Sequence, residues 1–149
     1  HTRQIEDFGG LSSSMPIYAT IFMIMTMSSI GLPGLNGFIG EFLVLVGSFR
    51  TQPIFAVIAA TAVIFAAAYL LWALQRIIYN KLDKPENAGI KDLNWREIGL
   101  LVPLLAGILW LGVYPKPLLD KTEAAARHLV TYVEANAAQS ATSVPNTAP

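Results

Sequence analysis

The sequence predicts an all-α membrane protein with three transmembrane crossings, the first of them a broken helix, followed by a C-terminal amphipathic helix. Hydrophobic residues make up 54% of the 149 residues and charged residues only 13%, about half of their usual share in a globular domain. The charges cluster between long apolar runs, and the run from Pro53 to Leu74 has no charge on any face. A soluble helix of that length would be charged on one face, so the pattern favours contact with lipid.

Composition also excludes several classes of function. The formal net charge is zero, so nothing indicates a nucleic-acid partner. Cysteine is absent, which excludes disulfides, thiolate metal sites and cysteine catalysis. His1 and His128 are isolated, so we expect no metal site, and no phosphate-binding or dinucleotide-binding loop is present. The chain begins with His1 and has no signal-peptide pattern, so we expect it to be a segment of a longer membrane protein.

The first crossing is predicted in the apolar stretch 15–49, after a polar loop at residues 1–14. Ser14 is a candidate N-cap, and Pro16 suits a first helical turn. As one straight helix the stretch would be roughly 50 Å long, against a hydrocarbon core of about 30 Å. Two complete crossings would need about 40 residues and a turn. The stretch is therefore too long for one straight crossing and too short for two.

The middle of this stretch cannot continue a helix. Residues 31–37 read Gly-Leu-Pro-Gly-Leu-Asn-Gly, and three glycines with a proline interrupt helical hydrogen bonding. We therefore predict one crossing made of two half-helices, about 15–30 and 38–49, joined by an unwound link. The residues predicted to form the break are Gly31, Pro33, Gly34, Asn36 and Gly37.

Two further crossings are predicted, at residues 53–79 and 97–114, with a polar loop at 80–96 between them. Aromatic residues lie near the ends of both, as in the aromatic belts of membrane proteins, and Arg76 can reach the lipid headgroups. Residues 115–136 then show apolar positions at helical spacing, which predicts an interfacial helix and loop. Residues 137–149 have the composition of a disordered tail.

The distribution of Lys and Arg predicts which side of the membrane each loop occupies. With three crossings, residues 1–14 and 80–96 share one side. That side carries Arg3, Arg76, Lys81, Lys84, Lys91 and Arg96, and the other carries Arg50, Lys116, Lys121 and Arg127. The excess weakly places residues 80–96 in the cytoplasm.

Glu41 is the candidate functional residue, because it is the only charge between residues 15 and 49. A carboxylate at membrane depth is costly, and such residues usually line an ion or proton path. Unwound backbone at that depth needs protein or water to satisfy its polar groups, and broken helices mark transport sites. Thr26, Ser28, Ser29 and Asn36 can supply such groups or hold water beside the break, although packing between helices is the favoured interpretation for Thr26. The alternative interpretation is that Glu41 lies near the bilayer surface and pairs with a neighbour.

Three strings of sequence carry a resemblance to a known family. They are residues 1–11 (His-Thr-Arg-Gln-Ile-Glu-Asp-Phe-Gly-Gly-Leu), Met15-Pro16, and residues 31–42 (Gly-Leu-Pro-Gly-Leu-Asn-Gly-Phe-Ile-Gly-Glu-Phe). They closely resemble subunit M, the mitochondrial chain-4 type, of proton-pumping NADH-quinone oxidoreductase, respiratory complex I. The resemblance continues to residues 112–120, and the string 31–42 is its most specific part.

The resemblance implies that the chain is the C-terminal part of an antiporter-like subunit built from two inverted repeats. Residues 15–49 resemble its broken helix 12, 53–79 its helix 13 and 97–114 its helix 14. Glu41 falls on the helix-12 glutamate, implicated in passing protons onward. Related subunits L and N tend to carry lysine at that position, so glutamate favours subunit M.

The implied function is proton translocation through the exit half of a channel, coupled to electron transfer in other subunits. NADH, flavin, iron–sulfur clusters and quinone are expected only in those subunits, and no redox site is expected in this chain. The implied partners are other membrane subunits of complex I, especially neighbouring antiporter-like ones, and the lipid bilayer of an energy-transducing membrane, most simply a bacterial plasma membrane. Two alternatives remain: a subunit of a related cation/proton antiporter, and a purely structural membrane subunit in which Glu41 is replaceable.

Overall fold

The structure, a computed structural model of the chain, describes residues 4–5, 8–83 and 85–142, with the backbone alone at residue 86 and residues 138–142. The described residues form helices and connections, with no strand among them, which confirms the predicted all-helical class. Two units are distinguished, residues 1–113 and 114–149. The helices are α1 (Leu11–Ser14), α2 (Pro16–Ser29), α3 (Asn36–Thr51), α4 (Pro53–Leu74), the π-helix η2 (Gln75–Tyr79), α5 (Pro85–Ala88), α6 (Trp95–Val113) and α7 (Lys116–Thr142).

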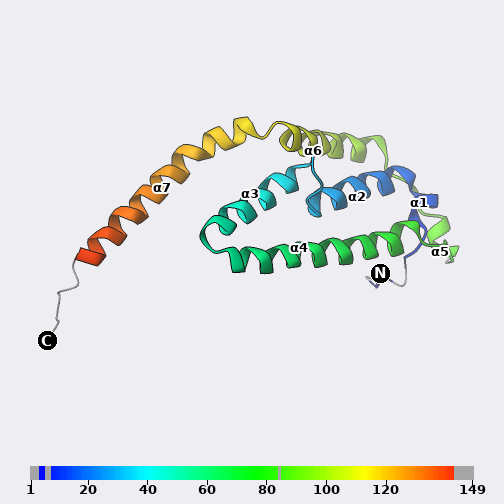
Figure 1. The fold of residues 1–149 in the computed structure, drawn as a ribbon. Coiled ribbons are helices and arrows are strands. Elements are labelled where there is room, and N and C mark those ends of the chain that lie inside the picture. The colour runs from blue at the N-terminus through cyan, green and yellow to red at the C-terminus, as the bar shows by residue number, and fades with distance from the viewer. Residues whose placement is uncertain (1–3, 6–7, 84, 143–149) are drawn as a thin grey trace. The chain divides into compact units, whose positions relative to one another are not determined.

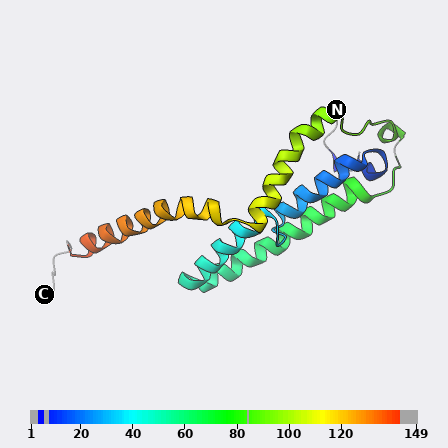
Figure 2. The ribbon, with the colours of Figure 1, turned by 90° about the horizontal axis from the view of Figure 1, so that it is seen from above.

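In the first unit, α2 and α3 follow one another end to end beside α4 (Figures 1 and 2). Helix α3 ends at Thr51, because Pro53 disfavours helical backbone at Gln52. The chain reverses there, and Pro53 occupies the first turn of α4, where its missing N–H costs nothing. Helix α4 therefore returns antiparallel to the interrupted pair α2–α3.

Two helices are long and apolar enough to cross a membrane, Pro53–Tyr79 (α4 with η2) and Trp95–Val113 (α6). Only 6% of the most apolar stretch of either helix is buried, whereas the core helix of a soluble protein would be mostly buried. Helices α2 and α3 have 14 and 16 residues, each short of the ~20 residues of a complete crossing. A single discontinuous crossing by α2 and α3 remains a proposal.

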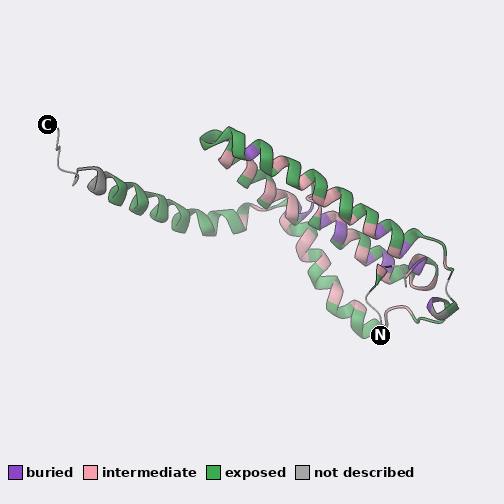
Figure 3. Cartoon of the chain, turned by 90° about the horizontal axis from the view of Figure 1, so that it is seen from below, coloured by how far each residue is buried: buried purple, intermediate pink, exposed green. Residues whose placement is uncertain are grey.

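The main cluster of buried hydrophobic residues lies at one end of the first unit, where α1, α2 and the end of α4 meet (Figure 3). Leu11 of α1 and Ala19 of α2 pack there with Leu74 and Ile78, and Ile78 has no exposed surface. The predicted polar loop 1–14 thus contains a short helix that contributes to this core. The hydrophobic contacts fix α2 against α4 at the end away from α3.

The N-terminus of α2 is capped by Asp92, from the loop between α4 and α6. Its two carboxylate oxygens accept hydrogen bonds from the amides of Ile17 (2.8 Å) and Tyr18 (3.1 Å). The prediction that Ser14 is the N-cap is wrong, because Met15 holds that position and no side chain within the segment caps it. Burial acts to raise the pKa of Asp92, but hydrogen bonds from Ile17, Leu93 and Tyr18 outweigh it and lower the pKa.

We predict that Asp92→Asn weakens this cap, because an amide has one acceptor oxygen and no charge to favour a helix N-terminus. Hydrogen exchange at the amides of Ile17 and Tyr18 should accelerate by about fivefold at neutral pH. The cap is present above the ordinary pKa of an Asp and is lost as pH falls through the lowered pKa of Asp92. The difference between parent and variant should therefore vanish in strong acid. Asp83→Asn, at an exposed residue of the same loop, is the control, and equal exchange in both variants would contradict the cap.

Helix α6 begins with a capping box. The Asn94 side-chain oxygen accepts hydrogen bonds from the amides of Arg96 and Glu97 at 2.9 and 3.1 Å, and the Glu97 carboxylate accepts one from the Asn94 amide at 2.9 Å. This reciprocal pattern satisfies amides that the first helical turn leaves without partners. It starts the helix at Trp95, two residues earlier than the predicted 97–114.

The predicted sidedness can be tested with two exposed positions of the first unit, Gly89 in the α4–α6 loop and Gln52 in the α3–α4 turn. The Lys/Arg excess predicts that a membrane-impermeant thiol reagent labels Gly89→Cys only from the cytoplasm and Gln52→Cys only from the opposite side. Labelling of the two variants from the reverse sides would overturn the assignment. Labelling of both from one side would overturn the idea that α4 crosses.

The second unit is described from Tyr114 to Thr142 and consists of one helix, α7. An ion pair between Glu123 and Arg127, four residues apart, lies on its surface. The helix runs past residue 136, where the sequence predicted disorder, because alanines at 135, 137 and 138 favour helix. Residues 143–149 of the predicted tail lie outside the described residues.

Candidate functional site

Helix α2 ends in a Schellman motif. Gly31 has a φ of 81°, a left-handed conformation that strains any residue with a Cβ. Its amide donates to the Ser28 carbonyl at 3.2 Å, and the Leu32 amide donates to the Met27 carbonyl at 3.1 Å. These two bonds satisfy carbonyls that the helix end would leave free.

A β-turn over residues 32–35 forms the rest of the link. The Leu35 amide donates to the Leu32 carbonyl at 3.1 Å, and Gly34 has a φ of 96°. Proline at the second position and a glycine with positive φ at the third are typical of a type II turn. The sequence Gly31 to Gly34 therefore encodes a defined link, in which the amides of Gly31 and Leu32 and the carbonyl of Leu32 are hydrogen-bonded.

The link is shorter than the predicted 31–37, because Asn36 and Gly37 lie in the first turn of α3. Asn and Gly are unfavourable inside helices but are tolerated at their starts, so composition alone extended the break too far. The Ser28 hydroxyl donates to the Asn36 side-chain oxygen at 2.5 Å and joins the two half-helices across the link. A Cβ on Gly37 would overlap the Ser28 carbonyl, so glycine lets the half-helices approach there.

Glu41 lies in the second turn of α3, and its carboxylate folds back over the link. A Cβ built on Gly31 would overlap the Glu41 carboxylate, so the carboxylate lies directly against the Gly31 α-carbon. The Glu41 side chain is half-buried. The structure thus brings the predicted carboxylate and the predicted break together, and the glycine is what leaves space for the contact.

The C-terminal end of α6 closes the other side of the link. Gly112 is buried, and a Cβ there would overlap the Gly34 carbonyl and reach the Leu35 α-carbon at 2.5 Å. Three helix ends therefore meet at the site, those of α2, α3 and α6. Thr26 and Ser29 do not join it, because their hydroxyls donate to carbonyls of their own helix, Phe22 and Met25.

The contact between Gly31 and Glu41 predicts different effects of alanine at the two left-handed glycines. Gly31→Ala and Gly34→Ala each place a Cβ at positive φ, a strain of about 1–2 kcal/mol. Only Gly31→Ala also displaces the Glu41 carboxylate, since apart from its chain neighbours no described residue has an atom within 4 Å of a Cβ on Gly34. We expect comparable assembly of the two variants in the parent subunit, but the lower proton-uptake rate from Gly31→Ala. Equal rates at equal assembly would contradict a role for this contact.

The chain is similar to known proteins over most of its length. Residues 1–66 match the family described as NADH:quinone oxidoreductase/Mrp antiporter, TM. NADH-quinone oxidoreductase subunit M of Rhodobacter capsulatus is 45% identical over 130 residues, which cover 87% of this chain and 25% of that protein. NADH-ubiquinone oxidoreductase chain 4 of Arabidopsis thaliana is 41% identical over 131 residues, 88% of this chain and 26% of that one.

A solved structure agrees with these relatives. A chain of the respiratory complex I from Thermus thermophilus with bound NADH matches with a TM-score of 0.72 and 35% identity, over 78% of this chain and 24% of that chain. Over most of its own length the chain is therefore similar to subunit M and chain 4 of this oxidoreductase. It spans about a quarter of the length of the relatives that it matches.

The site contains two contacts that were not predicted from the sequence. Gly112 against Gly34 joins residues far apart in the chain, and nothing local marks it. The sequence predicted that Ser28 and Asn36 could hydrogen-bond to backbone groups at the break, but not that the two side chains bond to each other. Both contacts hold the link in place around Glu41.

Proposed function

We propose that this chain is the part of a proton-translocating complex I subunit that carries the exit half of a proton channel, with Glu41 as the proton relay. The observation that carries the proposal is the Glu41 carboxylate lying against Gly31 at the break between α2 and α3. An isolated carboxylate within an otherwise uncharged apolar stretch is costly and is retained where it serves transport.

The break supplies what a relay needs. A proton must reach the carboxylate and leave it, which requires water or polar groups on both sides. The buried Ser28 hydroxyl and the exposed Asn36 side chain are hydrogen-bonded to each other beside the link, so they can hold water in a region that apolar helices otherwise line. A broken helix at membrane depth is also the arrangement that places binding groups at the midplane of transporters.

In this proposal the redox chemistry lies in other subunits of the complex. NADH, flavin, iron–sulfur clusters and quinone would bind there, and this chain would contribute proton transfer alone. Its partners would be the lipid bilayer and the adjacent membrane subunits, the antiporter-like ones first. The bacterial relative, at 45% identity, supports a bacterial plasma membrane as the location. The plant relative, at 41% identity, is of the chain-4 type.

The experiment compares two driving forces in inside-out vesicles that carry the full parent subunit. The complex I proposal predicts proton uptake that requires NADH and stops when a quinone-site inhibitor blocks electron transfer. The alternative, a cation/proton antiporter, predicts proton movement driven by a sodium or potassium gradient without NADH. The Mrp antiporters in the description of the matching family make this the alternative to exclude. Uptake that follows the cation gradient and ignores NADH would overturn the proposal.

A further inference from the structure

A second site lies at the end of α4, away from the helix break. A cavity of about 590 Å³ opens between η2 and the N-terminal segment, a size within the range of small-molecule sites. The described residues that line it are Ile5, Phe8, Trp72, Gln75, Arg76, Tyr79 and Asn80. They include one cation and no carboxylate.

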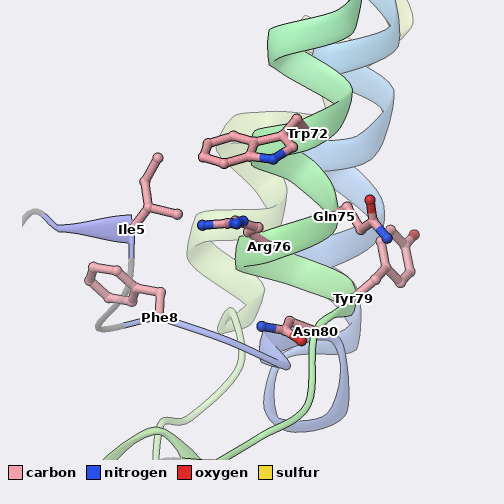
Figure 4. A pocket seen from close by; sticks show the side chains of 7 residues that line it. All are labelled: Ile5, Phe8, Trp72, Gln75, Arg76, Tyr79 and Asn80. Carbon is pink, nitrogen blue, oxygen red and sulfur yellow. The ribbon is translucent and has the colours of Figure 1, made fainter.

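The guanidinium of Arg76 is fixed in this cavity by stacking. Its central carbon lies 4.1 Å from the centre of a Trp72 ring, and residues four apart share a helix face. Figure 4 shows the guanidinium beneath the indole, opposite Ile5 and Phe8, with Asn80 below it. Stacking occupies the flat face of a guanidinium and leaves the N–H groups around its edge available to an anion.

The other two polar residues point away from this arrangement. In Figure 4, Gln75 and Tyr79 lie on the opposite side of η2, and the Tyr79 hydroxyl donates to the Met23 sulfur at 3.1 Å. Among the described residues that line the cavity, the Arg76 guanidinium and the Asn80 amide are therefore the polar groups on the side of Ile5 and Phe8. Both offer donors, and a stacked Arg with a neighbouring amide suits the oxygens of a phosphate group.

The position of the cavity along α4 identifies the source of the phosphate. Arg76 lies near the end of the apolar helix Pro53–Tyr79, where Trp and Tyr gather at the headgroup level of membranes. Ile5 and Phe8 provide an apolar wall beside the cation. A group with a phosphate at one end and hydrocarbon at the other matches both features, and a phospholipid is such a molecule.

We propose that this cavity binds the phosphate of an anionic phospholipid, with Arg76 as the principal ligand, Trp72 as its stacking support and Asn80 as a second donor. The inference rests on the membrane assignment of the chain and is independent of proton transfer by Glu41. The site would fix one lipid at the end of α4, against the segment that precedes α1.

The experiment uses the assembled complex with the full parent subunit in nanodiscs. Ile5→p-benzoylphenylalanine places a photo-cross-linker on the apolar wall and leaves the donors intact. Nanodiscs contain phosphatidylglycerol diluted in phosphatidylcholine, or phosphatidylcholine alone, and mass spectrometry identifies the adduct. The variants are Arg76→Gln, Arg76→Lys and Trp72→Leu. Arg96→Gln, at an exposed arginine of α6, is the matched control.

We expect a phosphatidylglycerol adduct in the parent complex that falls about tenfold in Arg76→Gln, because a charge-assisted hydrogen-bonded pair is lost. Arg76→Lys and Trp72→Leu should each reduce the adduct severalfold, because the first removes the planar guanidinium and the second removes the indole on which it stacks. Arg96→Gln should leave the adduct unchanged. If Arg76→Gln fails to assemble, Arg76→Lys decides, because it keeps the charge.

Four results would overturn the proposal. One is an equal lipid adduct in the parent, Arg76→Gln and Arg76→Lys complexes, and another is an adduct to a protein subunit in place of lipid. The third is loss of the adduct in the parent when inorganic phosphate is added, which would identify a soluble phosphate as the occupant. Residues 6 and 7, which are acidic, lie outside the described residues. The double variant Glu6→Gln with Asp7→Asn removes negative charges that would repel a phosphate, so the lipid adduct should persist or strengthen. Loss of the adduct in that double variant is the fourth result that would overturn the proposal.

Discussion

Glu41→Gln in the full parent subunit is expected to reduce NADH-driven proton uptake by about tenfold or more. Glutamine keeps the shape of the side chain over Gly31 but cannot take up or release a proton. The complex should assemble normally, because a neutral amide is less costly than a carboxylate within an apolar segment. Proton uptake, quinone reduction and assembly are measured in parallel on vesicles.

Two further variants test whether the carboxyl group of Glu41 is responsible for this result. Glu41→Asp keeps a carboxyl group one methylene shorter, so it should retain much of the activity if water bridges the added gap. Glu134→Gln, at an exposed residue of α7, should have no effect. If Glu41→Gln assembles and pumps at the parental proton-to-electron ratio and rate, the relay assignment is wrong and Glu41 is structural.

Gly112→Val is expected to have the largest effect on assembly. A Cβ at this position overlaps the Gly34 carbonyl, and backbone cannot move aside as a flexible side chain can. Forcing such a contact costs about 1–3 kcal/mol or more, and separation of α6 from the link would also disturb the turn at Gly34. The amount of assembled complex on native gels should fall by about tenfold.

Gly107→Val is the matched control for this prediction. It makes the same substitution in the same helix, with the same change in helix propensity. Apart from its own helix backbone, no atom of the described residues lies within 4 Å of a Cβ on Gly107. Assembly should therefore remain close to that of the parent. Equal assembly of Gly107→Val and Gly112→Val would show that packing of α6 on the link is unimportant.

Local chemistry made the break predictable from the sequence. Gly31, Pro33 and Gly34 each meet a backbone requirement within a few residues, the end of α2 and a turn, so composition sufficed to locate them. The capping box of Asn94 and Glu97 was equally local and equally readable, yet sequence reasoning overlooked it. The exact ends of the link depended on where α3 begins, which propensity fixes only within a few residues.

Contacts between distant segments were not predictable. The cap that Asp92 provides for α2 joins residues 75 apart in the chain. Ser14, the candidate nearest to α2 in the sequence, was wrong, because a side chain that is close in sequence is not always placed to reach the free amides of the helix. The approach of Gly112 to Gly34 likewise follows from how α6 crosses the link. Such contacts depend on tertiary packing, for which a single sequence contains no periodic pattern.

The most direct test of the relay assignment is whether Glu41 changes protonation during turnover. Infrared difference spectra of the complex, recorded before and after addition of NADH, report the carbonyl stretch of protonated carboxyl groups. If Glu41 is the proton relay, a band in this difference spectrum should disappear in Glu41→Gln and shift in Glu41→Asp. A difference spectrum that is identical in the parent and in Glu41→Gln would contradict it, because the carboxylate over Gly31 would then keep one protonation state throughout the cycle.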